Sequence, residues 1–127
     1  MSSTRVLVVV EDEPDMRMLI RVVLTRDERL EILGEAADAD TAVRLAERCE
    51  PGLVILDHLI EGEVMGLEAA PLIRKVAPNA KILLFTAFDM AAEARREPAI
   101  DAFLRKDEMA KLLPTVQQLL ELDSQPA

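Results

Sequence analysis

Short runs of apolar residues alternate along the chain with longer stretches in which apolar residues recur at helical spacing. The runs at 6–10, 53–56 and 82–85 contain no charged residue, which is typical of parallel strands that are buried on both faces. The run at 30–36 is interrupted by two glutamates and is expected at a sheet edge, and a fifth strand is expected over 100–104. This alternation predicts an α/β fold with five strands and five helices.

Helix signals lie between these runs. Pro14 suits the first turn of a helix. The expected apolar face of this first helix comprises Met16, Leu19, Ile20 and Val23. Asp38 can cap a second helix. The apolar residues of the second helix are Ala42, Ala46 and Cys49. The last helix is expected to present one stripe, formed by Met109, Leu112, Leu113, Val116, Leu119 and Leu120.

Two prolines interrupt the helical patterns. Pro71 falls in the third helix and Pro114 in the fifth. A proline inside a helix removes a backbone donor and crowds the preceding turn. We therefore expect the third helix to begin late, near Pro71, and the fifth helix to be kinked or irregular before Pro114.

Length and composition predict one domain over 1–127, with a core over about 4–122 and no output domain. Half of the 127 residues are apolar, enough to bury a core without disulfides or a structural metal. Cys49 is the only cysteine and has no disulfide partner, which favours a reducing, cytoplasmic location. No apolar run near the N-terminus is long enough for a signal peptide or a membrane span, so no membrane association is expected.

The net charge of −9 limits the classes of partner. Nucleic-acid binding requires clustered Lys and Arg that neutralise phosphates, which an acidic chain disfavours. We therefore expect protein partners and no direct binding to nucleic acid.

Acidic residues directly follow two of the buried runs. Glu11 and Asp12 come after 6–10, and Asp57 comes after 53–56. The carboxyl ends of parallel strands meet at one edge of a sheet, where ligands bind, so the three carboxylates are expected to share a pocket. Clustered carboxylates suit Mg²⁺, which prefers hard oxygen ligands. The combination indicates phosphoryl transfer, with Asp57 as the nucleophile.

The fourth and fifth runs end in complementary polar groups. Thr86 directly follows 82–85, and Lys106 comes shortly after 100–104. A hydroxyl donor and a compact positive charge are what an aspartyl phosphate needs. Singly, a strand-end acid is more often a helix cap and a lysine more often a solvated loop residue. The ordered set at four strand ends nevertheless favours a functional site.

Four segments carry a resemblance to a known family. They are Val-Glu-Asp-Glu at 10–13 with Arg17 following, Leu-Val-Ile-Leu-Asp at 53–57, Thr86-Ala87, and Phe103-Leu-Arg-Lys106. Jointly they are specific, and essentially the whole chain resembles the response-regulator receiver domains of bacterial two-component signalling. The resemblance implies a flavodoxin-like, CheY-like (βα)5 three-layer sandwich whose parallel sheet has the strand order 2-1-3-4-5.

The resemblance also implies roles for individual residues. Asp57 would be the phosphoacceptor, and Asp12 and Asp57 would bind Mg²⁺ together with the main-chain carbonyl of Leu59. Glu11 would act on the metal through water. The phosphoryl group would come from a histidine kinase or a phosphotransfer protein. The chain would then be a stand-alone switch and not an enzyme, with at most self-catalysed phosphotransfer and slow dephosphorylation.

Three positions resemble the part of the family that changes conformation. Thr86 and Lys106 would hold the phosphoryl group. Thr86 would move toward the phosphate while the aromatic side chain of Phe103 swings inward, which exposes a new binding face. That face would bind a downstream protein, and a homodimer is left open.

The sequence departs from the family pattern in two segments. In the stretch 58–66, Glu61 stands where the family usually has proline, and Gly66 falls about one residue late, so the loop beside the phosphoacceptor is lengthened. The segment 87–99 is about two residues shorter than usual. We therefore expect a short or mobile fourth helix.

Three residues near the site lead to further expectations. Leu59 and Phe88 occupy positions that, by the resemblance, flank the path of water to the phosphoryl group. Neither can orient water, so slow self-hydrolysis is expected. His58 is expected to face away from the Asp57 carboxylate, because neighbouring residues of an extended chain point to opposite sides.

Two other functions compete with the phosphorylated switch. One is a receiver-like adaptor that binds partners without phosphorylation, which the unusual segments at 58–66 and 87–99 favour. The other is an enzyme of the haloacid-dehalogenase type, which needs a second Asp two residues after the nucleophile. That position is Leu59, so the general acid is missing and the enzyme ranks a remote third.

Overall fold

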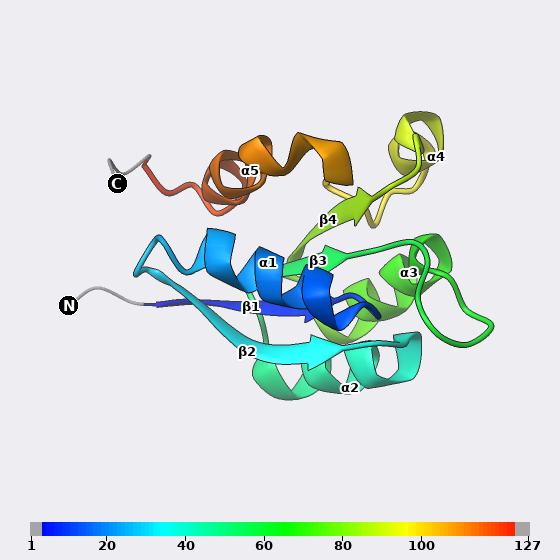
Figure 1. The fold of residues 1–127 in the computed structure, drawn as a ribbon. Helices are drawn as coiled ribbons and strands as arrows, with labels where there is room; N and C mark the ends of the chain where they lie inside the picture. Colours follow the sequence, from blue (N-terminus) through cyan, green and yellow to red (C-terminus); the bar gives the residue numbers. More distant parts are fainter. Residues whose placement is uncertain (1–3, 124–127) are drawn as a thin grey trace.

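A five-stranded parallel sheet forms the centre of the computed structural model, which describes residues 4–123 (Figure 1). The strands are β1 (Arg5–Val10), β2 (Leu30–Ala36), β3 (Leu53–Leu56), β4 (Lys81–Thr86) and β5 (Ala102–Arg105). Their spatial order is β2-β1-β3-β4-β5, and every neighbouring pair is parallel. The predicted flavodoxin-like fold and strand order are therefore confirmed.

Burial along the strands follows the apolar runs of the sequence. β3 is buried throughout and β4 is buried from Ile82 onward, as central strands with helices on both faces must be. β2 alternates between buried and exposed positions at the edge of the sheet, as predicted. β5 begins at Ala102, two residues later than expected, because the amide of Ile100 donates to the carbonyl of Glu97 in the preceding turn.

Helices cover both faces of the sheet (Figure 1). They are α1 (Pro14–Leu24), α2 (Ala39–Cys49), α3 (Gly66–Val76), α4 (Ala91–Arg96), a 3-10 helix η1 (Lys106–Lys111) and α5 (Leu112–Leu119). Alternate residues of β1 point to opposite faces, so Val8 packs with α2, α3 and α4 while Leu7 packs with α1 and α5. Over residues 4–123, no helix has the length and apolar character that a membrane span requires.

The first helix begins at Pro14, as predicted, but its buried face differs from the predicted one. The buried residues are Ile20, Val23 and Leu24. Leu19 is 43% exposed, so its assignment to the apolar face is wrong. Leu24 lies four residues after Ile20 and therefore on the same side of the helix, where it completes the buried face.

The second helix begins with the predicted cap. The Asp38 carboxylate accepts a hydrogen bond of 2.8 Å from the backbone amide of Thr41, which satisfies one of the free donors of the first turn. Ala42 and Ala46 are fully buried, and their small side chains let α2 lie close to the sheet. Cys49, at the end of the helix, is a partly exposed free thiol.

The third helix begins at Gly66 and not near Pro71, so that prediction is wrong. A close backbone contact determines this start. The amide of Gly66 donates to the carbonyl of His58 at 2.8 Å, and a Cβ at this position would lie 2.0 Å from the carbonyl oxygen of Asp57. Pro71 lies on the exposed side of the helix, where its ring meets solvent and its cost is confined to the local helical hydrogen bonding.

The segments around β5 are short and irregular. α4 has only six residues, which confirms the expected short fourth helix. η1 contains Glu108 in a non-helical conformation, and Pro114 is the third residue of α5, where its missing amide has no helical acceptor to lose. The predicted irregularity before Pro114 is therefore confirmed. The predicted stripe divides into buried Leu112, Val116 and Leu120 and partly buried Met109, Leu113 and Leu119.

A buried carboxylate joins the turn before β2 to α5. Asp27 is 2% exposed and accepts hydrogen bonds of 2.7 Å from Arg29 and 3.0 Å from the side chain of Gln117. The hydrogen bonds from Arg29, opposed by burial and aided by Gln117, hold the pKa of Asp27 well below its usual range. Folding therefore favours the charged form of this carboxylate.

We expect Asp27→Asn to lower the free energy of unfolding at neutral pH by about 1–3 kcal/mol, because Arg29 and Gln117 lose a charged acceptor. A lowered folded-state pKa stabilises the protein above the pKa of the unfolded carboxyl, and that stabilisation is lost as the pH falls through the folded-state pKa. The difference between variant and native chain should therefore shrink below about pH 4. Urea unfolding at several pH values measures this difference in the free energy of unfolding. Glu28→Gln removes an exposed charge from the same turn as the control, and equal losses in both variants would contradict the assignment.

Candidate functional site

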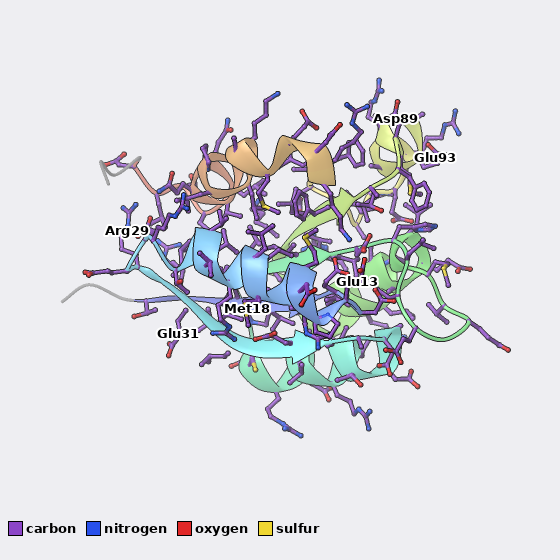
Figure 2. The ribbon with its side chains drawn as sticks, viewed as in Figure 1. Glu13, Met18, Arg29, Glu31, Asp89 and Glu93 are labelled. Carbon is purple, nitrogen blue, oxygen red and sulfur yellow. The ribbon has the colours of Figure 1, made fainter. Side chains whose placement is uncertain are left out.

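The carboxyl ends of the strands meet at one edge of the sheet, to which the arrowheads of β1, β3 and β4 all point (Figure 1). Five residues singled out from the sequence lie there, namely Glu11, Asp12, Asp57, Thr86 and Lys106. A cavity of about 290 Å³ opens at this edge. Its lining residues are Asp12, Glu13, Asp57, Leu59, Thr86, Ala87, Phe88 and Lys106. Glu13 lies at the start of α1 beside this edge (Figure 2).

Three carboxylates converge at the site. One oxygen from each of Glu11, Asp12 and Asp57 lies within 4.8 Å of the others. Backbone hydrogen bonds hold the two buried members: the amide of Glu11 donates to Ala36 at 2.8 Å, and the amide of Asp57 donates to Val10 at 3.0 Å. The last backbone hydrogen bonds between neighbouring strands therefore fix the positions of Glu11 and Asp57.

Burial changes the ionisation of Glu11. This side chain is 1% exposed, and burial, reinforced by the nearby Asp57 carboxylate, raises the pKa of Glu11 to about 7. Hydrogen bonds from Lys106 and from the amide of Glu13 act in the opposite direction without cancelling the effect. Removing a carboxylate from water disfavours its charged form. A cation bound nearby would therefore stabilise the charged form of Glu11.

Lys106 supplies the positive charge of the site. Its Nζ lies 2.7 Å from Asp57 Oδ2 and 2.7 Å from Glu11 Oε1, and its side chain is 14% exposed. Burial lowers the pKa of Lys106, but the hydrogen bonds to Asp57 and Glu11 outweigh burial and leave that pKa raised. The ammonium therefore stays charged and links the end of β5 to the ends of β1 and β3.

Thr86 presents an unsatisfied hydroxyl to the cavity. The residue is fully buried, and its Oγ1 has no hydrogen-bond partner among the residues that the structure describes. Buried polar groups normally have a partner, because leaving one without costs free energy. An oxygen atom that entered the cavity could accept this hydrogen bond.

Two apolar side chains border the same cavity. Leu59 is 49% exposed and Phe88 is 48% exposed, and both line it. His58 faces α3, because its Nδ1 accepts a hydrogen bond of 3.2 Å from the amide of Leu67. Its backbone amide donates to Asp57 Oδ1 at 2.7 Å. The imidazole thus lies outside the residues that line the cavity, as expected.

Phe103 lies apart from this group. It pairs in the sheet with Leu84, two residues before Thr86, and is partly buried against the helical layer of α2, α3 and α4. There it lines a separate cavity of about 300 Å³ together with residues of α4 and the start of β5. The structure therefore places Phe103 behind the site and does not bring it into the Asp57 cavity.

Arg17 makes a contact with the site that the sequence pattern did not reveal. Its guanidinium donates a hydrogen bond of 2.7 Å to the main-chain carbonyl of Glu11. It also lies 3.4 Å from the carboxylate of Glu35. The available signal was the place of Arg17 shortly after the segment 10–13, but that spacing does not distinguish a main-chain contact from a solvated arginine.

The side chains of the site fit a magnesium ion. Mg²⁺ takes oxygen ligands, usually one or two carboxylates completed by water and phosphate oxygens, and the three converging carboxylates offer such oxygens. Among the described residues, Lys106 is the ion-pair partner of Glu11 and Asp57, so three carboxylates share one ammonium. Among residues 4–123, Asp12 has no ion-pair partner of its own, so its carboxylate is available to a cation.

The sequence matches known signalling proteins. Residues 7–117 match the family model described as the response regulator receiver domain. The response regulator protein VraR of Staphylococcus aureus is 31% identical over 104 residues, which cover 80% of this chain and 49% of VraR. The transcriptional regulatory protein PdtaR of Mycobacterium tuberculosis is 33% identical over 115 residues, covering 89% of this chain and 55% of PdtaR. The chain thus spans about half the length of these relatives.

Solved structures show the same similarity. A two-component response regulator of the LuxR family from Aurantimonas superposes with a TM-score of 0.85 and 29% identity, covering 94% of this chain and 86% of its own. The response regulator TrrA from Thermotoga maritima, solved in complex with Mg(2+)-BeF, has a TM-score of 0.79 and 32% identity, covering 91% and 99% of the two chains. The receiver of Thermotoga maritima CheB, with a TM-score of 0.80 and 24% identity over 96% and 99% of the chains, supports the fold.

We expect Mg²⁺ to raise the free energy of unfolding of the native chain, as any ligand specific to the folded state does, by about 1.4 kcal/mol at roughly nine times its Kd. Asp12→Asn should remove most of this rise, because it takes one carboxylate from the cluster. Glu13→Gln alters an adjacent residue that lines the cavity outside the cluster and should retain the rise. Urea unfolding with and without Mg²⁺ gives the comparison. An equal response of the two variants to Mg²⁺ would argue against a metal site at Asp12.

Proposed function

The chain belongs to the response regulator receiver domain family of two-component signalling, and from this membership we propose that it is a switch whose phosphoacceptor is Asp57. The observation that carries the proposal is the arrangement of Asp57 between Lys106, 2.7 Å away, and the neighbouring carboxylates of Glu11 and Asp12. A buried carboxylate that shares an ammonium with a second acid and opens onto a cavity suits covalent chemistry better than a purely structural role.

In the proposed reaction, a carboxylate oxygen of Asp57 attacks the phosphorus of a phosphohistidine. A P–O bond forms, the P–N bond of the donor breaks, and the histidine nitrogen leaves with the electron pair and takes up a proton. Lys106, already paired with Asp57 Oδ2, keeps a positive charge beside the acyl phosphate. Thr86, whose hydroxyl lacks a partner among the described residues, would donate to a phosphoryl oxygen.

Magnesium would complete the site in this proposal. Asp12 and Asp57 would bind it with the main-chain carbonyl of Leu59, Glu11 would act through water, and the ion would neutralise the phosphoryl oxygens. The similarity to TrrA, whose structure was solved with Mg(2+)-BeF, supports this assignment. So does the excess of carboxylates over ammonium groups at the site, where three acids lie close to one lysine.

The switch proposal extends to Thr86 and Phe103. Thr86 would turn toward the phosphoryl group, and Phe103 would move inward behind it. The cavity of about 300 Å³ between α4 and β5, which Phe103 lines, supports this part because it offers room for an aromatic ring to change position. The short α4 would then change the face that a downstream protein binds.

We propose a histidine kinase or a phosphotransfer protein as the donor. Support comes from an exposed apolar face on α1, next to the site, where Met18 is 68%, Leu19 43% and Val22 52% exposed; Figure 2 shows Met18 on this helix. Exposed apolar groups that lie together favour protein contacts. The net charge of −9 supports protein partners over direct nucleic-acid binding. We further propose that the switch is a single domain, that it acts in the cytoplasm and that it can form a homodimer.

A phosphorylation-independent adaptor is the second candidate. The lengthened loop at 58–66 is fixed to the turn before α2, where the amide of Glu61 donates to Ala37 at 2.9 Å and Glu61 forms an isolated bridge with Asp38. This gives the molecule an acidic surface next to the site that could bind a partner directly. An adaptor, however, has no need of the buried pair of Asp57 and Lys106, which favours the switch.

We expect the native chain to gain the mass of one phosphoryl group when treated with acetyl phosphate and Mg²⁺, and Asp57→Asn to gain none. Intact mass spectrometry distinguishes the two proteins, and Glu63→Gln, an exposed acid of the nearby loop, should behave like the native chain. Absence of a gain in the native chain would favour the adaptor. A gain that persists in Asp57→Asn would place the phosphoacceptor elsewhere.

We expect the phosphorylated chain to lose its phosphoryl group slowly, over minutes or longer, because Leu59 and Phe88 cannot orient a water molecule. The double variant Leu59→Asn with Phe88→Glu should shorten the half-life roughly tenfold or more, since polar groups can position water for attack. The rate of loss measured by mass spectrometry tests this. Val64→Asn changes an exposed residue of the same loop that does not line the cavity and should have no effect. A native half-life of seconds would contradict the expectation.

A further inference from the structure

The guanidinium of Arg17 is fixed at two points. Its NH1 donates to the main-chain carbonyl of Glu11 at 2.7 Å, and its Nε lies 3.4 Å from Oε1 of Glu35 on β2. The Arg17 side chain is 25% exposed, so much of it is shielded from water. A planar guanidinium held from two sides has a fixed orientation, in contrast to a lysine or a solvated arginine.

The carbonyl that Arg17 contacts lies at a critical point of the chain. β1 ends at Val10, and the amide of Glu11 still bonds to Ala36 across the sheet, but the Glu11 carbonyl belongs to the peptide that leads out of the strand. That peptide is planar and joins Glu11 directly to Asp12. Its orientation therefore determines the directions from which both acidic side chains start.

We propose that Arg17 is a positioning residue for the metal site, which holds the peptide between Glu11 and Asp12 and so sets the affinity for Mg²⁺. Groups that orient metal ligands without touching the ion commonly change metal affinity by about 10- to 100-fold when removed. Arg17 reaches the site through the main chain, and Glu35 provides its anchor on β2. The inference rests on the proposed function, because it assumes that the acids bind a divalent cation.

Arg21 provides a matched control. It lies one turn later on α1 and forms an ion pair with the same Glu35 carboxylate, but no hydrogen bond joins it to Glu11 among the described residues. Arg17→Met and Arg21→Met therefore remove the same charge and the same ion-pair partner from one helix. Only the first removes the bond to the peptide of the site.

Isothermal titration of Mg²⁺ into the full chain tests the proposal. We expect Arg17→Met to weaken Mg²⁺ binding about tenfold. Arg21→Met should leave the affinity within about twofold of the native value, which is much less than the change expected when a positioning group is removed. Arg17→Lys should recover part of the affinity, since an ammonium can still donate to the carbonyl. In metal-free protein, the backbone amide resonance of Asp12 should shift in Arg17→Met and not in Arg21→Met.

The outcomes separate this inference from the proposed function. If the native chain binds no Mg²⁺, the proposed function fails and the role of Arg17 fails with it. If the native chain binds Mg²⁺ and the two methionine variants bind it equally well, only the role of Arg17 is overturned. If urea unfolding shows that Arg17→Met is not folded, Arg17→Lys and Arg21→Lys are compared instead. We expect Arg17→Lys to bind Mg²⁺ more weakly than Arg21→Lys, and equal affinities would again overturn the inference.

Discussion

The site depends on one electrostatic arrangement, in which a single ammonium lies between two buried carboxylates. Glu11 and Asp57 are buried side by side, and burial, reinforced by the neighbouring carboxylate, disfavours the charged form of Glu11. Lys106, 2.7 Å from each, offsets part of this cost. The three residues follow β1, β3 and β5, so the arrangement requires these strands to be assembled in one sheet.

The backbone fixes the acceptor as firmly as the charges do. The carbonyl of Asp57 lies so close to Gly66 that no side chain could occupy that position, and the amide of His58 bonds to Asp57 Oδ1. Lys106 holds the other carboxylate oxygen. The start of α3 is consequently part of the site, because it closes one side of the strand end from which Asp57 projects.

Features that depend on local pattern could be predicted from the sequence, and features that depend on contacts between distant segments could not. Buried runs followed by acids specified the strands and the grouping of residues at their ends. The start of α3 was missed because Pro71 is a strong local signal, whereas the close approach of Gly66 to Asp57 exists only in three dimensions. The bond from Arg17 to the Glu11 carbonyl was missed for the same reason, since helical spacing shows which face a residue is on but not what it meets.

On the proposed chemistry, the charges that assemble the site also determine what a bound phosphoryl group would need. Three carboxylates face one ammonium, so a phosphoryl group would enter a region that is already negative, and its retention would require a divalent cation. Thr86, whose hydroxyl lacks a partner in the described structure, carries a small energetic cost that a phosphoryl oxygen would relieve. Thr86 ends the strand that pairs with β5, and Phe103 lies on β5 beside a cavity under α4. If the proposed switch operates, the relief of this buried hydroxyl would be connected through two adjacent strands to the surface of α4 and β5, and a change at one side chain would then have a route to a change of binding face.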